Sequence, residues 1–549
     1  MAHTHTLKSH LSVLQTSASL YQTLPAFYVP QILSDSGDVE SWEPVSYIQF
    51  LFHVELFARH WARVLKLDGI PQRSVIGMWL SGMTYIDVLH IYGLSRAGYI
   101  PQLFSIRLPN PDVVCELLIK AKARALLVDP SFESILKGCP VPTHRAAMTI
   151  YDIDSHEAPL PSLPTLRESD IVFVFHTSGS TSGTPKLVPC SLSWLDSAVT
   201  KSYQIAKPSG QTERNQDVTV WMGSMCHIAQ TFMFLGSLQH GACTVQPSKQ
   251  AFSSHELSLM IRDCGLNRIN QFATFLTHHL RNSRQNPRLL ALLQSLDDVL
   301  YSGLALPQEE EKWAHGNGIK LRNLFGSTEC GAMLLSTRGS EDTATLLQPL
   351  KGMSYAFFPI ASQSAAESPQ TEQHCNTTLL ELVILKESPD CPDGSLRAAD
   401  GHFHTGDLFQ EVRPGYYLSK GRDDDWIKSE NSLRCDTKAI EDNVRATCGD
   451  LVTECVVVGN GRPSPALFIE TNSEMPQPKL KREVLRRTRQ FHSRRYLHER
   501  ITSVDLIVIV EKGSLPRTAT KGNVRRRATE EAFRTLLDKI YGTEWTGAS

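Results

Sequence analysis

The chain has 549 residues, 41% hydrophobic and 20% charged, which is enough apolar material for at least one large core and excludes a chiefly disordered protein. Its 55 basic and 57 acidic residues give a formal net charge of -2. This balance supplies no long-range field that would attract nucleic acid or an anionic membrane, so we expect neither as a partner. At roughly 150 residues per domain, the length allows three or four domains.

The cysteines and the N-terminus predict the cellular compartment. Twelve cysteines are spread along the chain without a Cys-x-x-Cys pair or zinc-ligand spacing, which indicates reduced thiols. The first six residues lack the basic and apolar segments of a secretory signal, and no uncharged apolar run approaches the ~18 residues of a membrane span. We therefore expect a cytoplasmic protein without a membrane span.

The N-terminal three quarters of the chain alternate short apolar runs with helical spacing. Residues 75–80 and 98–101 read as strands joined by a helix at 85–97. Further strands are predicted at 125–128 and 171–175. This alternation is typical of α/β layers built around a mainly parallel sheet.

The composition changes near residue 420. Beyond it, short strands mixed with basic helices predict a small α+β domain. We therefore predict a large N-terminal layered α/β domain at residues 1–420 and a C-terminal domain at 421–549. In the second domain we expect strands at 455–458, 466–470 and 506–510 and helices at 479–500 and 521–539.

A loop rich in Ser, Thr and Gly carries the first chemical signal. Residues 175–186, with the sequence FHTSGSTSGTPK, directly follow an apolar strand. Their hydroxyls and unobstructed backbone N–H groups can surround polyphosphate oxygens, and Lys186 supplies a cation. No Gly-Lys-Ser/Thr follows at the spacing of a Walker loop, so the sequence predicts a phosphate loop of another type.

This loop resembles an element of the adenylate-forming superfamily, which comprises acyl-CoA synthetases, peptide-synthetase adenylation domains and luciferases. The superfamily reads Thr-Ser-Gly-Thr-Thr-Gly-x-Pro-Lys, and this chain has one extra residue before Pro185. Four later segments resemble further motifs of the superfamily in the same order. The likeness spans roughly residues 45 to 530 and extends most closely to the adenylation domains of fungal peptide-synthetase-like reductases. Nothing like their carrier or reductase domains follows, so we expect a stand-alone enzyme.

The resemblance implies a site for ATP and Mg2+. Residues 323–329 (NLFGSTE) match the element whose Thr contacts the α-phosphate and whose Glu holds the metal, here Glu329. A carboxylate is the usual ligand of such a hard cation. Residues 404–408 (HTGDL) match the motif whose Asp binds the ribose. The residues so implied for the nucleotide are Thr177, Ser178, Gly179, Ser180, Thr181, Lys186, Asn323, Leu324, Thr328, Asp407 and Arg422.

Two lysines of the C-terminal part are implied as catalytic. Residues 515–522 (LPRTATKG) resemble a tail whose mobile lysine bridges the substrate carboxylate and the α-phosphate, with Lys and Gly exchanged, which indicates Lys521. Residues 421–428 (GRDDDWIK) resemble the segment between the domains, with Asp424 at the hinge and Lys428 active in the second half-reaction. The resemblance thus implies a small mobile domain that closes over the site.

The acyl pocket is implied around His227, which occupies the place of an aromatic or His residue beside the adenylate in the superfamily. Relatives that activate amino acids carry Asp at the next position, whereas this chain has Ile228. An apolar side chain cannot compensate a buried ammonium, so we expect an aromatic or apolar acid without an α-amino group. The other pocket residues implied are Phe272, Tyr301, Ser302, Gly303, Leu324 and Met333.

We therefore expect an acid ligase of secondary metabolism that forms an acyl-adenylate from a small carboxylic acid and ATP and releases pyrophosphate. We expect coenzyme A first as the acceptor of the acyl group, with a carrier protein or an amine as the alternatives. A carrier protein or a downstream acyltransferase is also possible as a partner. Because two motifs are irregular, a degenerate nucleotide-binding protein is an alternative. Nucleic-acid binding through the basic helix at 479–500 is a third, which the charge balance disfavours.

Overall fold

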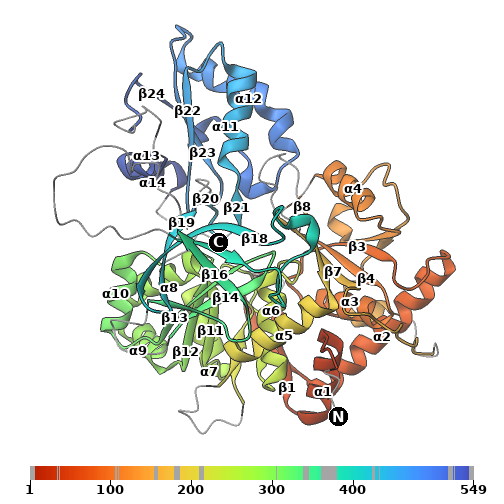
Figure 1. Ribbon diagram of the computed structural model, residues 1–549. Helices are drawn as coiled ribbons and strands as arrows, with labels where there is room; N and C mark the ends of the chain where they lie inside the picture. Colours follow the sequence, from red (N-terminus) through yellow and green to blue (C-terminus); the bar gives the residue numbers. More distant parts are fainter. Residues whose placement is uncertain are drawn as a thin grey trace. The chain divides into compact units, whose positions relative to one another are not determined.

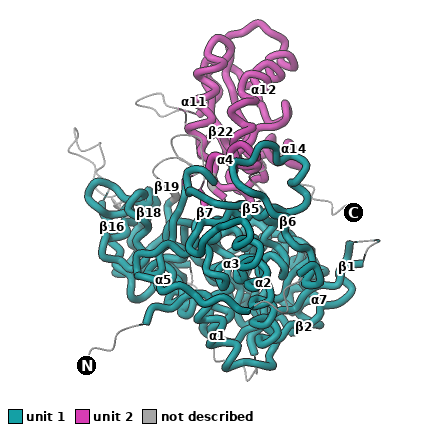
Figure 2. Tube along the Cα trace, turned by 90° about the vertical axis from the view of Figure 1, so that its right-hand side faces the viewer, with its two compact units in different colours: residues 1–105, 118–175, 187–423 teal, residues 106–117, 176–186, 424–549 magenta. Residues whose placement is uncertain are grey.

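The computed structural model separates into two compact units, which Figure 2 colours separately. The larger unit comprises residues 1–105, 118–175 and 187–423, and the smaller unit comprises 106–117, 176–186 and 424–549. The domain boundary expected at residue 420 stays a prediction. The residues that the structure describes are 6–33, 35, 37–105, 108, 110–153, 159–177, 186–208, 216–303, 306–337, 345–359, 380–422, 427–431, 433–516, 524 and 526–542.

A six-stranded sheet contains the first predicted strands, in the order β6-β5-β3-β4-β7-β8. The strands from β6 to β7 pair in parallel, as the alternation of strand and helix predicted. Helix α3 (Tyr85–Arg96) connects β3 to β4 and begins where the Thr84 hydroxyl accepts the Asp87 N–H at 3.2 Å. The strands are β3 (Val75–Leu80), β4 (Ile100–Ser105), β5 (Ala125–Val128), β6 (Thr143–Arg145), β7 (Ile171–Thr177) and β8 (Lys186–Ser191).

A thirteen-stranded sheet has a parallel and an antiparallel half, in the order β16-β17-β18-β19-β15-β14-β13-β12-β11-β9-β10-β1-β2. The strands from β13 to β1 pair in parallel, and those from β13 to β16 are antiparallel. The strands are β1 (Pro25–Ile32), β2 (Val39–Ser46), β9 (Val218–Val220), β10 (Cys243–Val245), β11 (Arg268–Phe272), β12 (Asp298–Ser302), β13 (Leu321–Ser327), β14 (Gly331–Ser336), β15 (Leu347–Pro349), β16 (Tyr355–Pro359), β17 (Leu380–Ile384), β18 (Phe403–Arg413) and β19 (Tyr416–Arg422).

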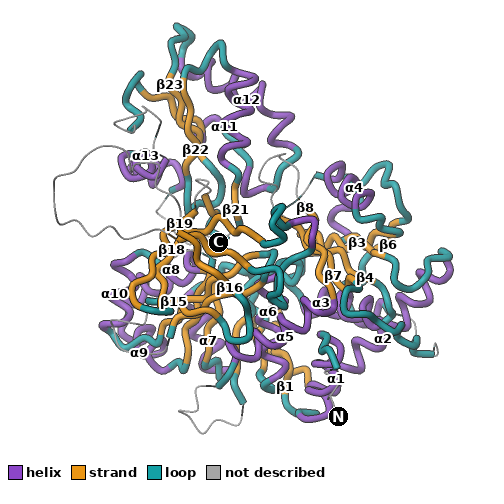
Figure 3. The backbone as a smooth tube through the Cα atoms, viewed as in Figure 1, coloured by secondary structure: helices purple, strands orange, loops and turns teal. Residues whose placement is uncertain are grey.

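Helices cover both faces of the parallel half of this sheet. On one face, α7 to α10 gather beside β11 to β13 and share a hydrophobic core with them (Figure 1). On the other face, α5 and α6 lie in a larger core that also contains α1 to α3 and residues of the six-stranded sheet (Figure 3). The helices are α1 (His10–Leu20), α2 (Tyr47–Leu67), α4 (Pro111–Lys120), α5 (Leu192–Ala206), α6 (Ile228–Gln239), α7 (Ser254–Asp263), α8 (Ala273–Gln285), α9 (Pro287–Ser295) and α10 (Gln308–Gly316).

A buried charge network joins the amino ends of β11, β12 and β13. The Asp298 carboxylate accepts hydrogen bonds from Arg322 Nε at 2.7 Å and from Arg268 Nη2 at 3.0 Å. Arg322 Nη2 also donates to the carbonyl oxygen of Ile205, near the end of α5, at 3.1 Å. The three charged side chains therefore fix three neighbouring strands and one helix to one another.

The smaller unit contains a three-stranded sheet with the order β22-β23-β24. The residue bounds of these strands are close to those of the three predicted strands. The predicted helix 479–500 was too long, because α12 ends at Ser493. Beyond it, the buried Arg495 pairs with Glu499 at 3.0 Å, which requires the chain to turn into the core. The elements are β20 (Ile427–Lys428), β21 (Arg434–Cys435), α11 (Thr437–Cys448), β22 (Glu454–Val458), β23 (Ala466–Glu470), α12 (Gln477–Ser493), β24 (Ile507–Val510), α13 (Arg526–Ala532) and α14 (Arg534–Tyr541).

The charge network yields a stability prediction. Asp298→Ala should lower the free energy of unfolding by about 3–5 kcal/mol, because it leaves the buried Arg322 guanidinium without its carboxylate and leaves Arg268 with Asp217 alone, at 2.9 Å. Urea titration of the intrinsic fluorescence measures this change. The control is Asp263→Ala, which removes an exposed carboxylate paired with the adjacent Arg262 and should have little effect. Equal losses in both variants would contradict the assignment.

Candidate active site

Three predicted site residues meet where parallel strands end. The register pairs Phe272, the last residue of β11, with Ser302 of β12, and it pairs Ser302 with Leu324 of β13. The Ser302 hydroxyl donates to the carbonyl oxygen of Leu324 at 2.6 Å. Asn323 lies beside Tyr301 in the same register. The carboxyl edge of a parallel sheet is where α/β proteins usually bind their ligands.

His227 joins this group from the N-terminus of α6. Its half-buried ring packs edge-on against Phe272, with ring centroids 6.2 Å apart and an interplanar angle of 81°. Nδ1 accepts the backbone N–H of Ala229 at 3.3 Å, which places the proton of the neutral ring on Nε2. A Cβ at Gly223 would lie 3.1 Å from Gln250 Nε2 and 3.2 Å from the Phe272 ring, so glycine leaves room for both side chains.

The segment before His227 is held between the two sheets. Met225 N–H donates to the carbonyl oxygen of Gly82 at 2.8 Å, and the Ser224 hydroxyl donates to that of Ser81 at 2.7 Å. The side-chain oxygen of Gln230, on α6, accepts the Met222 N–H at 2.7 Å. These bonds fix the backbone that presents the imidazole, although the sequence analysis did not identify them.

Thr328 and Glu329 lie in the tight turn between β13 and β14. Both are half-buried, and they follow an antiparallel pairing of Ser327 with Gly331. A Cβ at Gly326 would lie 2.5 Å from the carbonyl oxygen of Gly331, so the two strands approach closely only because this residue is glycine. The turn thus presents one hydroxyl and one carboxylate beside the carboxyl edge of the parallel strands.

Helix α5 supports the turn through residues that the sequence analysis missed. Trp194 Nε1 donates to the carbonyl oxygen of Glu329 at 3.0 Å, and Lys201 Nζ donates to that of Cys330 at 2.5 Å. The two donors lie about two helical turns apart and therefore on one face of α5. A lysine seven residues after a tryptophan in one helix was the available signal.

Asp407 and Arg422, both predicted for the ribose, are register partners on β18 and β19. Asp407 is 2% exposed, and its N–H donates to the Thr405 hydroxyl at 3.0 Å. His404 lies between Asp400 and Glu381, with ring nitrogens 3.0 and 3.1 Å from their carboxylates. These hydrogen bonds, led by that of Asp400, raise the pKa of His404 above its ordinary value. The segment is therefore well anchored in its sheet.

Two residues predicted for the acyl pocket lie in hydrophobic cores instead. Tyr301 is 2% exposed and packs between the sheet and α7 to α10, where its hydroxyl donates to Glu311 at 2.7 Å. Because side chains alternate along a strand, Tyr301 faces away from the side of Ser302. Met333 is fully buried in a separate cluster with Cys330 and Phe409. Neither side chain lies in the cluster that contains Phe272, and the pocket role of each stays a prediction.

The other predicted site residues lie apart from this group in the fold or lie outside the described residues. Thr177 ends β7 and Lys186 begins β8, whereas Gly303 follows β12 with a φ of +90°. Lys428 belongs to the smaller unit, and its N–H donates to Asn460 Oδ1 at 2.9 Å. The roles of all the predicted site residues stay predictions. Ser178, Gly179, Ser180, Thr181, Asp424 and Lys521 lie outside the described residues.

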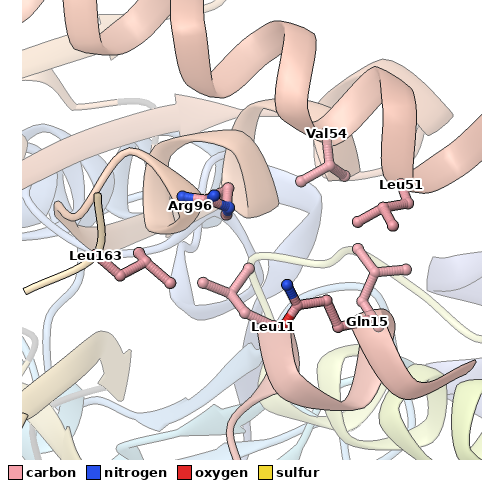
Figure 4. Close-up of a pocket in the computed structure, with 7 residues that line it drawn as sticks. Leu11, Gln15, Leu51, Val54, Arg96 and Leu163 are labelled. Carbon is pink, nitrogen blue, oxygen red and sulfur yellow. The ribbon is translucent and has the colours of Figure 1, made fainter. Parts of the chain in front are cut away.

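A small pocket elsewhere in the larger unit contains none of the predicted site residues (Figure 4). It is lined mainly by apolar side chains of α1 and α2 together with Arg96, whose Nη1 donates to the carbonyl oxygen of Pro161 at 2.8 Å. Among the described residues, no group of three or more His, Cys, Asp or Glu could hold a metal ion. Likewise, no helix in the described part is long and apolar enough to cross a membrane.

Comparison with known proteins supplies the family. The model for AMP-binding enzymes matches residues 32–355, and that for the AMP-binding enzyme C-terminal domain matches 424–544. The AMP-binding domain-containing enzyme iboA of Amanita muscaria is 38% identical over 522 residues, which cover 93% of this chain and 98% of that enzyme. The adenylate-forming reductase Nps10 of Heterobasidion annosum is 22% identical over 87% of this chain and 45% of its own length.

A solved structure has the same fold. O-succinylbenzoate coenzyme A synthetase from Bacillus subtilis, in complex with ATP and magnesium ion, aligns with a TM-score of 0.60 at 17% identity. The alignment covers 96% of this chain and all of that chain. These matches confirm the resemblance inferred from the ordered motifs. The chain belongs to the AMP-binding enzyme family and is an adenylate-forming acid ligase by family.

Proposed function

We propose that the protein activates a small carboxylic acid with ATP, forms an acyl-adenylate with release of pyrophosphate, and transfers the acyl group to a second nucleophile. The observation that carries this proposal is the gathering of His227, Phe272 and Ser302 at the carboxyl edge, together with the turn of Thr328 and Glu329 that extends β13. Apolar side chains beside a hydroxyl and a carboxylate suit an acid that meets a metal-bound polyphosphate.

Residues of the larger unit would hold the α-phosphate, the metal and the ribose of the nucleotide. The half-exposed Thr328 hydroxyl and Glu329 carboxylate match the oxygen donors that Mg2+ and phosphate oxygens require. Bound magnesium would neutralise charge on the phosphates. Asp407, opposite Arg422 in the register, would accept hydrogen bonds from the ribose. Attack of a carboxylate on the α-phosphorus depends mainly on positioning and charge stabilisation, which these groups supply.

The acid would be aromatic or apolar and would lack an α-amino group. Ile228, next to His227, is 5% exposed and belongs to the large hydrophobic core. It offers no carboxylate for a substrate ammonium, whose burial without a partner is costly. The His227 ring and Phe272 present an apolar wall with one N–H donor. This composition fits a flat or apolar acyl group.

Coenzyme A is the first candidate for the second nucleophile. The synthetase from Bacillus subtilis, with which this chain shares its fold, supports a thiol acceptor. A carrier-protein thiol or an amine is the second candidate. A degenerate nucleotide-binding protein would share the fold without turnover.

The first test is an acid panel with ATP and Mg2+. We expect pyrophosphate release with at least one aromatic or apolar acid, and a hydroxamate when hydroxylamine traps the adenylate. Repeating the assay with and without coenzyme A identifies the acceptor, because a thioester forms only with the thiol present. Binding of ATP without AMP, pyrophosphate or hydroxamate from any acid would reject the ligase function.

The second test separates the two half-reactions. Lys521→Ala should reduce adenylate formation by orders of magnitude, because its ammonium would balance charge at the α-phosphorus, and should affect thioester formation from preformed adenylate much less. Lys428→Ala should show the reverse pattern. Lys539→Ala removes an exposed lysine of α14 and serves as the control. Equal effects of both catalytic variants on both steps would contradict the assignment.

A further inference from the structure

Lys201 and Asp390 form an ion pair inside the larger unit. Both side chains are 0% exposed, and Lys201 Nζ lies 2.7 Å from Asp390 Oδ2. Removing two charges from water costs several kcal/mol per ion by general estimates, and their attraction returns this only with good geometry and further hydrogen bonds. A pair buried so completely therefore calls for a role beyond stability.

Each partner of the ion pair makes further hydrogen bonds. Asp390 accepts from the Ser388 hydroxyl at 2.5 Å and from the Tyr355 hydroxyl. Burial raises the pKa of Tyr355 well above its ordinary value, so the phenol keeps its proton and donates. The carboxylate is thus held from three directions, and it in turn fixes the position of the ammonium.

The ammonium is directed at the turn that carries Thr328 and Glu329. Lys201 donates to the carbonyl oxygen of Cys330, and Trp194 donates to that of Glu329. Two consecutive carbonyl groups of one turn are therefore held by two donors of a single helix face. A charged donor forms a stronger hydrogen bond than a neutral one, so Lys201 restrains the turn most.

We propose that Lys201 is a positioning residue, held by Asp390, which fixes the turn so that Thr328 and Glu329 meet Mg-ATP in one orientation. This proposal rests on the proposed function, because the turn has a nucleotide to meet only in an adenylate-forming enzyme. Lys201 touches neither substrate nor metal in this scheme and acts through the backbone of Cys330.

The test uses Lys201→Met/Asp390→Asn in the full chain. The double variant leaves no charge unpaired, and Asn still offers an oxygen to Ser388 and Tyr355. Two readouts are measured: hydrogen exchange of the backbone amides of residues 326–332, and the dissociation constants of ATP with Mg2+ and with EDTA. We expect exchange to accelerate and Mg-ATP binding to weaken, each about tenfold for a lost charged hydrogen bond, with metal-free ATP binding weakened less because it uses only the Thr328 contact.

Two further variants keep the result interpretable. Gln204→Ala removes another α5 side chain that donates to a backbone carbonyl, that of Lys351 at 3.0 Å, and should leave both readouts unchanged. Trp194→Phe keeps an aromatic side chain but removes the N–H donor to Glu329 together with part of the indole, and it should shift both readouts in the same direction by less, because the lost donor is neutral. If the double variant does not fold, Trp194→Phe alone tests the positioning role.

The outcomes separate this proposal from the proposed function. Unchanged exchange in both the double variant and Trp194→Phe overturns the positioning role, and so does faster exchange with unchanged Mg-ATP affinity. Failure of the wild-type protein to bind Mg-ATP rejects the proposed function instead, while the exchange data still show whether the ion pair fixes the turn. Equal weakening of ATP binding with and without Mg2+ indicates general damage and also counts against the role.

Discussion

The carboxylate of Asp298 is the contact on which the larger unit depends. It lies between Arg268 and Arg322 at the amino ends of three parallel strands, and both guanidinium groups reach it from the same face of the sheet in the observed register. A slip of one residue would turn every side chain of a strand to the opposite face. The same register aligns the opposite ends of the strands, so the position of Phe272 beside Ser302 follows from it.

Helix α5 makes hydrogen bonds at both ends of these strands. Its last turn offers the carbonyl oxygens of Ile205 and Ala206 to the two arginines. Its middle reaches the β13–β14 turn through Trp194 and Lys201. A single rigid helix therefore links the buried charges to the residues that would meet the phosphates, and the chemistry of the site is supported by groups that contact no ligand.

The sheet also determines which face each residue predicted for the pocket occupies. Tyr301 and Ser302 are adjacent in sequence, yet one packs under α7 to α10 and the other lies beside Phe272. Met333 is in a third cluster because β14 turns back antiparallel to β13. A resemblance to a family predicts which position along the chain carries a role. The alternation of side chains along the strand determines on which face of the sheet that residue's side chain lies.

The sequence by itself determined the family, the α/β layers and the order of the motifs, because strand–helix alternation and the Ser/Thr/Gly loop are local patterns. It also identified His227, Thr328, Glu329 and Asp407 as candidates. Only the tertiary structure decided the antiparallel half of the large sheet, the end of α12 at Ser493 and the buried pair of Lys201 and Asp390. Those features depend on contacts between residues far apart in the chain, and no local pattern encodes which distant carboxylate a buried lysine will meet.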